Sequence, residues 1–130
     1  MPAIERDIYS QFKAHATFLC VYIEEAHAMD EWPISSARYN KGVPVNIRQP
    51  KTDQERMKVA QEFRKNFQLT MPLCIDPPEL NNPFEKAYAP WPLRMFCIEN
   101  GKVSWIAQPK NCEYDAGELR GFLEQRFATK

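Results

Sequence analysis

The sequence predicts an α/β domain built around a mixed sheet, and three observations support this. Residues 18–23 form a run of six apolar residues, a pattern typical of a strand covered on both faces. Asn100-Gly101 separates two apolar runs and is a strong hairpin signal. Helical spacing of apolar residues precedes, separates and follows these strands. We therefore expect the order helix, strand, helix, strand, hairpin, helix.

Length and charge limit the classes of function. The chain has 130 residues, which suits one domain spanning 1–130. Its 17 basic and 17 acidic residues balance, so no excess charge indicates nucleic acid or an anionic membrane as a partner. No signal peptide or apolar run of about 18 residues is present, so we expect the chain as given to be soluble. With the cysteine pattern described below, the expected location is cytoplasmic. Membrane anchoring of a longer form stays open.

The first predicted helix covers residues 2–16. Pro2 suits a first helical turn, where its missing N–H is not needed. Ile4, Ile8 and Phe12 recur every four positions and should form the buried stripe of this helix. The strand at 18–23 follows.

A long connection, 24–51, leads to the second helix, and 43–47 is a candidate edge strand because Pro44 is tolerated there. Thr52 and Glu55 have the spacing of a capping box that opens a helix ending near Asn66. Four side chains are expected to face inward from it: Met57, Ala60, Phe63 and Phe67.

The second half of the chain predicts a short strand, a hairpin and a final helix. The strand is 72–75, and the hairpin strands are 93–99 and 102–107. Asp115 is placed to cap the last helix. Its apolar stripe is Leu119, Phe122, Leu123 and Phe127.

The four cysteines, Cys20, Cys74, Cys97 and Cys112, have neither CxxC nor zinc-site spacing. The first three lie in apolar, strand-like runs, where cysteine usually behaves as a small buried hydrophobe. A reducing compartment is the simpler interpretation.

A βαβ unit followed by a ββα unit is the arrangement of the thioredoxin fold. The segment that begins at Pro92 resembles the part of that fold that opens with a cis-proline beside the nucleophile. A trans proline at a strand start is the alternative. That fold normally begins with a strand that delivers a cysteine or selenocysteine to a helix N-terminus. We expect this first strand and its nucleophile to be missing from the chain.

The stretch from Glu24 to Trp32 is the first candidate for a functional site. It follows the strand at 18–23, and ligands gather at the carboxyl ends of strands in α/β sheets. His27 lies among its acids, and a functional histidine is one interpretation of this pattern. The alternative is a solvated, salt-bridged loop residue. A metal site is not expected, because the chain has two histidines.

This stretch, preceded by Val21-Tyr22-Ile23, closely resembles the motif of the iodothyronine deiodinase family. The resemblance covers nearly the whole chain. The other residues that match the family pattern are Gln49 and Arg56, Asp76, Ala87-Tyr88, Arg94, Gly101 and Glu118-Leu119-Arg120.

The resemblance implies a thiol or selenol oxidoreductase that reductively removes iodine from an aromatic ring such as that of an iodothyronine. His27 would be a proton donor near the halogen or phenol, and Glu25 would set its tautomer or extend a proton path. Trp32, Pro92 and Arg94 would contact the substrate, Arg94 through an anionic group. The alternative for Arg94 is an exposed strand residue without a binding role. No bound cofactor is implied, but an external thiol reductant is, and a homodimer is a further implication of the resemblance.

Several positions depart from the family pattern. Pro50 and Leu93 replace a histidine and an acid, and 107–110 replaces a glycine-rich stretch. If the nucleophile is a selenocysteine encoded by UGA, a gene model starting at the next methionine would omit it. Two alternatives stay open: a thioredoxin-fold peroxidase, and a non-catalytic module that binds a partner or an aromatic ligand.

Overall fold

The computed structural model describes residues 4–26, 28, 30–31, 47–91, 93–107 and 116–127. The predicted elements occur in the predicted order within these residues, and two further short helices precede the hairpin. The predicted positions 43–46, Cys112 and Asp115 lie outside them. The elements are a π-helix Ile4–Tyr9 continuing into α1 (Ser10–Phe12), β1 (Cys20–Tyr22), α3 (Asp53–Phe67), β2 (Leu73–Ile75), a 3₁₀-helix Pro78–Leu80, α4 (Pro83–Tyr88), β3 (Met95–Glu99), β4 (Lys102–Ala107) and α5 (Ala116–Arg126).

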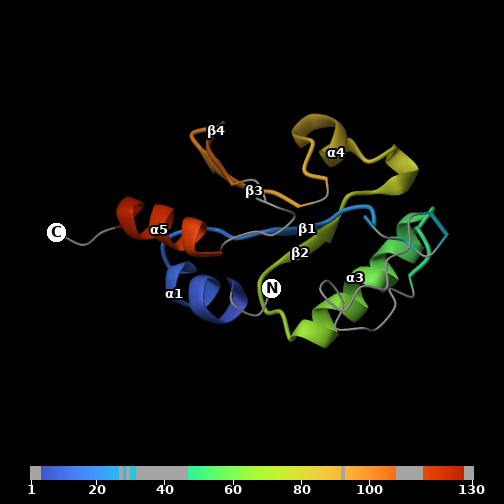
Figure 1. Cartoon of the computed structure of the whole chain (residues 1–130), viewed down its shortest axis with the longest axis horizontal. Helices are drawn as coiled ribbons and strands as arrows, with labels where there is room; N and C mark the ends of the chain where they lie inside the picture. The colour runs from blue at the N-terminus through green and yellow to red at the C-terminus, as the bar shows by residue number, and fades with distance from the viewer. Residues whose placement is uncertain are drawn as a thin grey trace.

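The strands form two separate two-stranded sheets. β1 pairs with β2 in parallel, with Val21 opposite Cys74, and β3 pairs with β4 in antiparallel. The expectation of one continuous mixed sheet is therefore not met, because no strand of the described residues joins β1 to β3. In Figure 1, β1 and β2 cross the middle of the molecule, α1 and α3 lie below them, and α4 lies above.

The hairpin turn has the geometry that its sequence predicts. Asn100 and Gly101 both have positive φ, 52° and 76°, as a type I′ turn requires. The pairing shifts between Cys97 and Ile98, which leaves Ser104 as the extra residue of a β-bulge.

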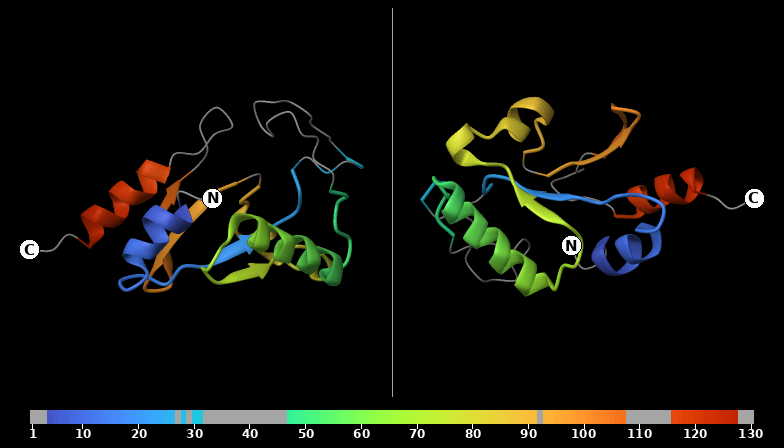
Figure 2. Two further views of the ribbon diagram at one scale, coloured as in Figure 1. Left: turned by 90° about the horizontal axis from the view of Figure 1, so that it is seen from below. Right: turned by 180° about the vertical axis from the view of Figure 1, so that it is seen from behind.

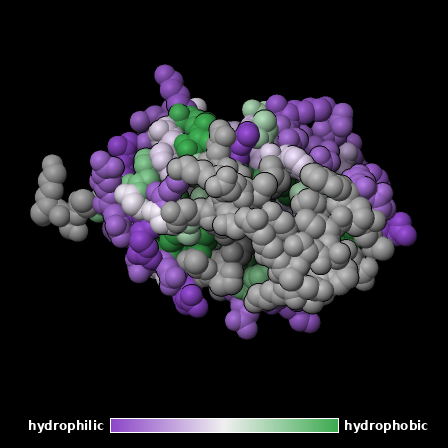
Figure 3. Space-filling view, in the orientation of Figure 1, coloured by the Kyte–Doolittle hydropathy of each residue, from purple (hydrophilic) through white to green (hydrophobic). Residues whose placement is uncertain are grey.

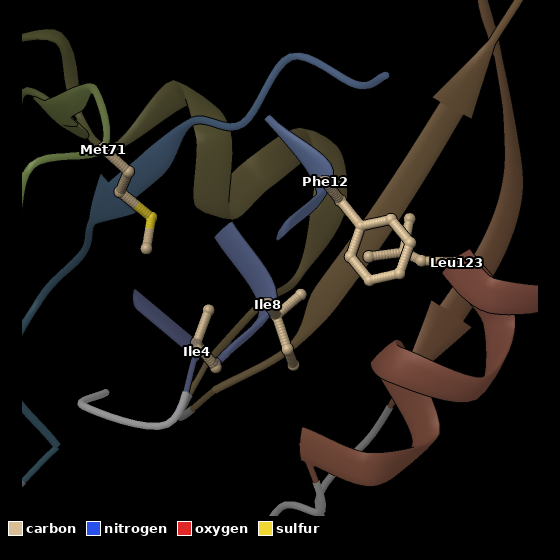
Figure 4. Packing of buried hydrophobic residues seen from close by; sticks show 5 residues of the cluster. All are labelled: Ile4, Ile8, Phe12, Met71 and Leu123. Atoms are coloured by element: carbon tan, nitrogen blue, oxygen red, sulfur yellow. The ribbon is translucent and has the colours of Figure 1, made fainter. Parts of the chain in front are cut away.

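One hydrophobic core supports both sheets. Its buried centre comprises Ile4, Ile8, Phe12, Met71 and Leu123, which confirms the predicted stripe of the first helix (Figure 4). α1 and α5 lie side by side in both views of Figure 2. Cys20 of β1 and Met95 of β3 both pack against this cluster. The two sheets are thus held by the same group of side chains.

Helix α3 is capped as predicted but presents a different face to the protein. Thr52 Oγ1 accepts the Glu55 backbone N–H at 3.1 Å. The prediction that Met57 and Phe67 face inward is wrong, because they are 46% and 43% exposed. Arg56 is buried instead, on the same helical stripe as Ala60.

Two further expectations from the apolar runs need correction. The run at 18–23 is not covered on both faces, since Leu19 is 60% exposed and β1 is half-buried. Cys74 is exposed rather than buried. Both follow from short strands in a two-stranded sheet, where side chains on one face lack a covering layer. The hairpin also exposes apolar side chains, Ile98, Val103 and Ile106, and Figure 3 shows apolar surface over this region.

The connection after β2 contains helices that the sequence analysis missed. Pro83 occupies the first turn of α4, where its fixed φ is favourable. Pro83 is therefore a helix-start signal within a proline-rich stretch.

Candidate functional site

The candidate site lies at the carboxyl ends of β1 and β2. These strands are parallel, so Tyr22 and Ile75 end at the same edge of the sheet. The backbone N–H of Asp76, just after β2, donates to the carbonyl oxygen of Tyr22 at 2.9 Å. The residues that follow both strands are thereby brought together, as the position of Glu24 and its neighbours after a strand predicts.

Glu25 is the predicted catalytic residue that the structure describes at this edge. It is half-buried, and its carboxylate accepts a hydrogen bond from the Tyr22 hydroxyl. Burial raises the pKa of Glu25, whereas the Tyr22 hydrogen bond and the Arg56 charge lower it. Burial, and then the hydrogen bond to Glu25, raises the pKa of Tyr22, so the phenol stays protonated and remains the donor. The pair is thus a proton-bearing group next to an ionisable carboxyl.

A buried arginine lies beside this pair. Arg56 is 1% exposed, and its Nη1 donates to the carbonyl oxygen of Asp76 at 2.6 Å and to Asn82 Oδ1. Its Nε has no hydrogen-bond partner within the described part of the chain. Burial lowers the pKa of Arg56, while the charges of Glu24, Asp76 and Glu25 raise it. Arg56 therefore supplies the positive charge that balances the acids at this edge.

Asp76 is equally buried and positions α4. Its carboxylate accepts the backbone N–H groups of Phe84 and Glu85, at 2.8 and 2.9 Å. A carboxylate at a helix N-terminus satisfies free N–H groups and complements the helix dipole. The same contact places the rings of Phe84 and Tyr88 near Phe96 of β3, with centroids 6.2 and 5.2 Å apart. Asp76 thus links the strand ends to an aromatic cluster.

Arg94 lies just before β3 and is half-buried. Its Nη1 donates to the carbonyl oxygen of Ala89, and its Nε has no hydrogen-bond partner in the described segments. Burial and the charges of Glu24 and Asp76 raise the pKa of Glu85. The hydrogen bond from the Trp91 N–H and the charge of Arg94 lower it. Arg94 is therefore close enough to Glu85 to act on it, but no contact between Arg94 and Glu25 is seen.

A buried amide ties down the loop that carries Glu25. Gln49 is 5% exposed, and its Oε1 accepts the Glu25 N–H at 3.0 Å. Its Nε2 donates to the Glu25 carbonyl oxygen at 2.9 Å and to Glu31 Oε1 at 2.8 Å. Its backbone N–H donates to Asp30 Oδ1 at 2.8 Å, which lowers the pKa of Asp30.

Of the five predicted site residues, Glu25 and Arg94 are described, whereas His27, Trp32 and Pro92 lie outside the described residues. Sequence reasoning assigned no role to Tyr22, Gln49, Arg56 or Asp76. A signal for Arg56 was present, since it shares a helical stripe with Ala60 and Phe63. The others were visible only as residues that carry the family resemblance.

The described residues also form a hollow whose lining includes sequence neighbours of Gln49 and Arg56. This hollow of about 390 Å³ on the N-terminal half of α3 is lined by Ile47, Arg48, Pro50, Glu55, Lys58, Val59 and Glu62. Among the described side chains, no group of three His, Cys, Asp or Glu is arranged to hold a metal ion. In the same segments, no helix combines the length and the apolar character needed to cross a membrane.

Comparison with known proteins gives a consistent result. The family model described as iodothyronine deiodinase matches residues 1–127. The type II iodothyronine deiodinase of Homo sapiens is 25% identical over 130 residues, which are 100% of this chain and 46% of the relative. The thyroxine 5-deiodinase of Gallus gallus is 32% identical over 120 residues, 92% of this chain and 43% of the relative. The chain thus spans about half the length of the curated relatives that it matches.

Proposed function

Because the chain belongs to the iodothyronine deiodinase family, we propose that it forms the substrate-binding side of a reductive dehalogenation site. The observation that carries the proposal is the Tyr22–Glu25 hydrogen bond beside buried Arg56, at the carboxyl ends of two parallel strands. This arrangement holds a protonated phenol and an ionisable carboxyl at the sheet edge where substrates of α/β proteins bind. The proposed substrate is an iodinated phenol of the iodothyronine class.

The proposed reaction needs a soft nucleophile and two thiols. A selenolate or thiolate attacks the iodine, so the carbon–iodine bond breaks and a selenium–iodine or sulfur–iodine bond forms. The ring carbon keeps the electron pair and takes a proton, for which His27 is the proposed donor and Glu25 the proposed path. One external thiol then releases iodide, and a second regenerates the nucleophile by thiol exchange. Two thiols are oxidised to one disulfide for each iodine removed.

We propose that the nucleophile is a selenocysteine or cysteine encoded upstream of residue 1, because Cys20 and Cys74, on the two strands that lead to the site, are poorly suited. Burial raises the pKa of Cys20, and partial desolvation followed by the charge of Asp76 raises the pKa of Cys74, although the Cys74 side chain is exposed. A reactive cysteine usually has a lowered pKa, since the thiolate is the nucleophile. The genomic sequence upstream decides this point: a frame without a Cys or UGA codon would contradict it.

The corresponding fold is a thioredoxin-like one, in which a strand lies between β1 and β3. Cys20 of β1 and Met95 of β3 pack on the same hydrophobic cluster, which supports a shared sheet. We expect amide hydrogen exchange of β1 to slow in a chain extended by the upstream strand, because its second edge would gain a ladder partner. Unchanged exchange in β1 and β3 would argue against this arrangement.

Binding and turnover are tested separately. We expect residues 1–130 to bind thyroxine, measured by quenching of tryptophan fluorescence, and to show no thiol-dependent iodide release. The extended protein should release iodide. Arg94→Met should weaken thyroxine binding about tenfold but leave a decarboxylated analogue unaffected, because the guanidinium is proposed to bind the carboxylate.

Arg126→Met is the matched control, since Arg126 pairs with Glu99 of the hairpin and not with residues at the carboxyl ends of β1 and β2. Equal losses for both ligands with Arg94→Met would refute the proposed role of Arg94. Iodide release by purified 1–130 would refute the proposed source of the nucleophile.

A non-catalytic binding module is the second candidate, favoured by the raised pKa values of Cys20 and Cys74. Thyroxine binding without iodide release by the extended protein would select it.

A further inference from the structure

We propose that Gln49 is a positioning residue, whose side-chain amide clamps the acidic loop after β1 in the conformation that the site uses. The amide spans two points of that loop. It makes a two-bond pair with the backbone of Glu25, at 3.0 and 2.9 Å, and it also donates to the Glu31 carboxylate at 2.8 Å. The Gln49 backbone adds a bond to Asp30.

The chemistry of the clamp requires an amide. The Glu25 backbone presents one donor and one acceptor, and a planar carboxamide matches both at once. A leucine of similar size satisfies neither, and an ionised glutamate faces the Glu25 carbonyl and the Glu31 carboxylate without a proton to donate. Because Gln49 is 5% exposed, water cannot readily replace a lost bond. The side chain is therefore chosen by its hydrogen-bonding pattern rather than by its volume.

The clamp connects to the site through Glu25. Fixing the backbone of Glu25 directs its carboxylate toward the Tyr22 hydroxyl, from which the carboxylate accepts a hydrogen bond. Glu25 and Glu31 also flank His27 in the sequence, so one side chain holds the chain on both sides of that histidine. The importance of this for catalysis rests on the proposed function, but the clamp itself does not.

The test uses Gln49→Glu, because protonation can restore a donor. Among the residues that the structure describes, the charged groups near this loop are the acids Glu25, Asp30, Glu31 and Glu55 and the cations Arg48, Lys51 and Arg56. Lys51 Nζ lies 3.7 Å from the Glu31 carboxylate but is exposed, so it screens the repulsion only weakly. Burial against two oxygen acceptors favours the neutral form of the introduced carboxyl.

We expect hydrogen exchange at the amides of Glu25 and Gln49, normalised to the wild type at each pH, to depend on pH in Gln49→Glu. Protection should recover toward that of the wild type at about pH 4.5, where the carboxyl O–H replaces one of the two donated bonds, and should be about tenfold lower at about pH 8. Comparison at equal pH removes the titration of Glu25 itself. Gln49→Leu should lose protection at both pH values.

Gln61→Glu is the control, because it makes the same change at an exposed position of α3 and should leave the protection of the loop unchanged. Gln49→Glu with no pH dependence, or Gln49→Leu with wild-type protection, would show that Gln49 only fills space. If Gln49→Leu does not fold, the pH profile of Gln49→Glu still decides.

The clamp and the proposed function fail in different ways. Loss of protection in a protein that never binds thyroxine would leave the clamp standing and remove the function. If Gln49→Glu binds thyroxine with wild-type affinity at about pH 8 while the amides of the loop have lost their protection from exchange, the positioning role would be overturned.

Discussion

At the scale of single residues, burial decides the protonation of the Tyr22–Glu25 pair. The folded protein raises the pKa of Glu25, chiefly by desolvation, so the protonated carboxyl is favoured relative to the unfolded chain. The resulting stabilisation is present at low pH and is lost as the pH rises through the folded pKa. The Tyr22 hydrogen bond works in the opposite direction, because it stabilises the carboxylate.

Tyr22→Phe should therefore raise the pKa of Glu25 further and destabilise the protein more at high pH than at low pH. We expect a loss of about 2 kcal/mol in the free energy of unfolding above the pKa of Glu25, where a charged acceptor loses its donor, and about 1 kcal/mol below it. Urea unfolding at the two pH values measures this difference. Tyr9→Phe removes a hydroxyl beside the hydrophobic core and should show no such pH dependence. An equal loss of stability at both pH values in Tyr22→Phe would show that the Tyr22 hydroxyl does not stabilise the ionised form of Glu25.

At the scale of elements, two glycines occupy opposite situations. Gly101 has φ 76° in the hairpin turn, a region that side chains rarely adopt, whereas Gly121 lies inside α5. An added Cβ meets no atom within 4 Å at either position. Any difference between the two substitutions must therefore come from the backbone conformation rather than from packing.

Gly101→Ala should cost about 1 kcal/mol, because it places alanine in the left-handed region. Gly121→Ala should stabilise the protein by about 0.5–1 kcal/mol, because alanine favours the helix. Thermal unfolding of the two variants gives opposite shifts in Tm. Shifts of the same sign would contradict the assignment of either the turn or the helix.

The elements also show where sequence reasoning succeeds. The Asn100-Gly101 turn and the Thr52 cap were predictable because each depends on local chemistry. The inward face of α3 was not, since an arginine at position 56 becomes core only when the backbone of Asp76 and the side chain of Asn82 receive it. Those partners are 20 and 26 residues away along the chain.

At the scale of the whole molecule, both sheets depend on one cluster of side chains. The Gln49 contacts to Glu25 and Glu31 likewise join distant parts of the chain, and no periodic pattern in the sequence predicts these contacts. The sequence thus predicted where the site lies, at the end of the strand at 18–23. The hydrogen bonds within the site could be identified only from the tertiary structure. The strand itself was predicted as too deeply buried, because an apolar run does not reveal how many layers cover it.

Leu123→Ala should destabilise the protein by about 2–5 kcal/mol, because Leu123 is 4% exposed within the shared core. Hydrogen exchange should quicken in β1 and β3 together. Leu80→Ala makes the same change at a side chain that is 69% exposed and should cost less than about 0.5 kcal/mol. Faster exchange confined to one of the two sheets would show that they have independent cores.

The bond between Asp30 and Gln49 has a consequence for how the chain can vary. It brings positions 30 and 49, which are 19 residues apart in the sequence, to within 2.8 Å between donor and acceptor. The place of Gln49 beside the loop after β1 is therefore fixed by a local contact. Variation at position 30 is limited to side chains that can accept this hydrogen bond.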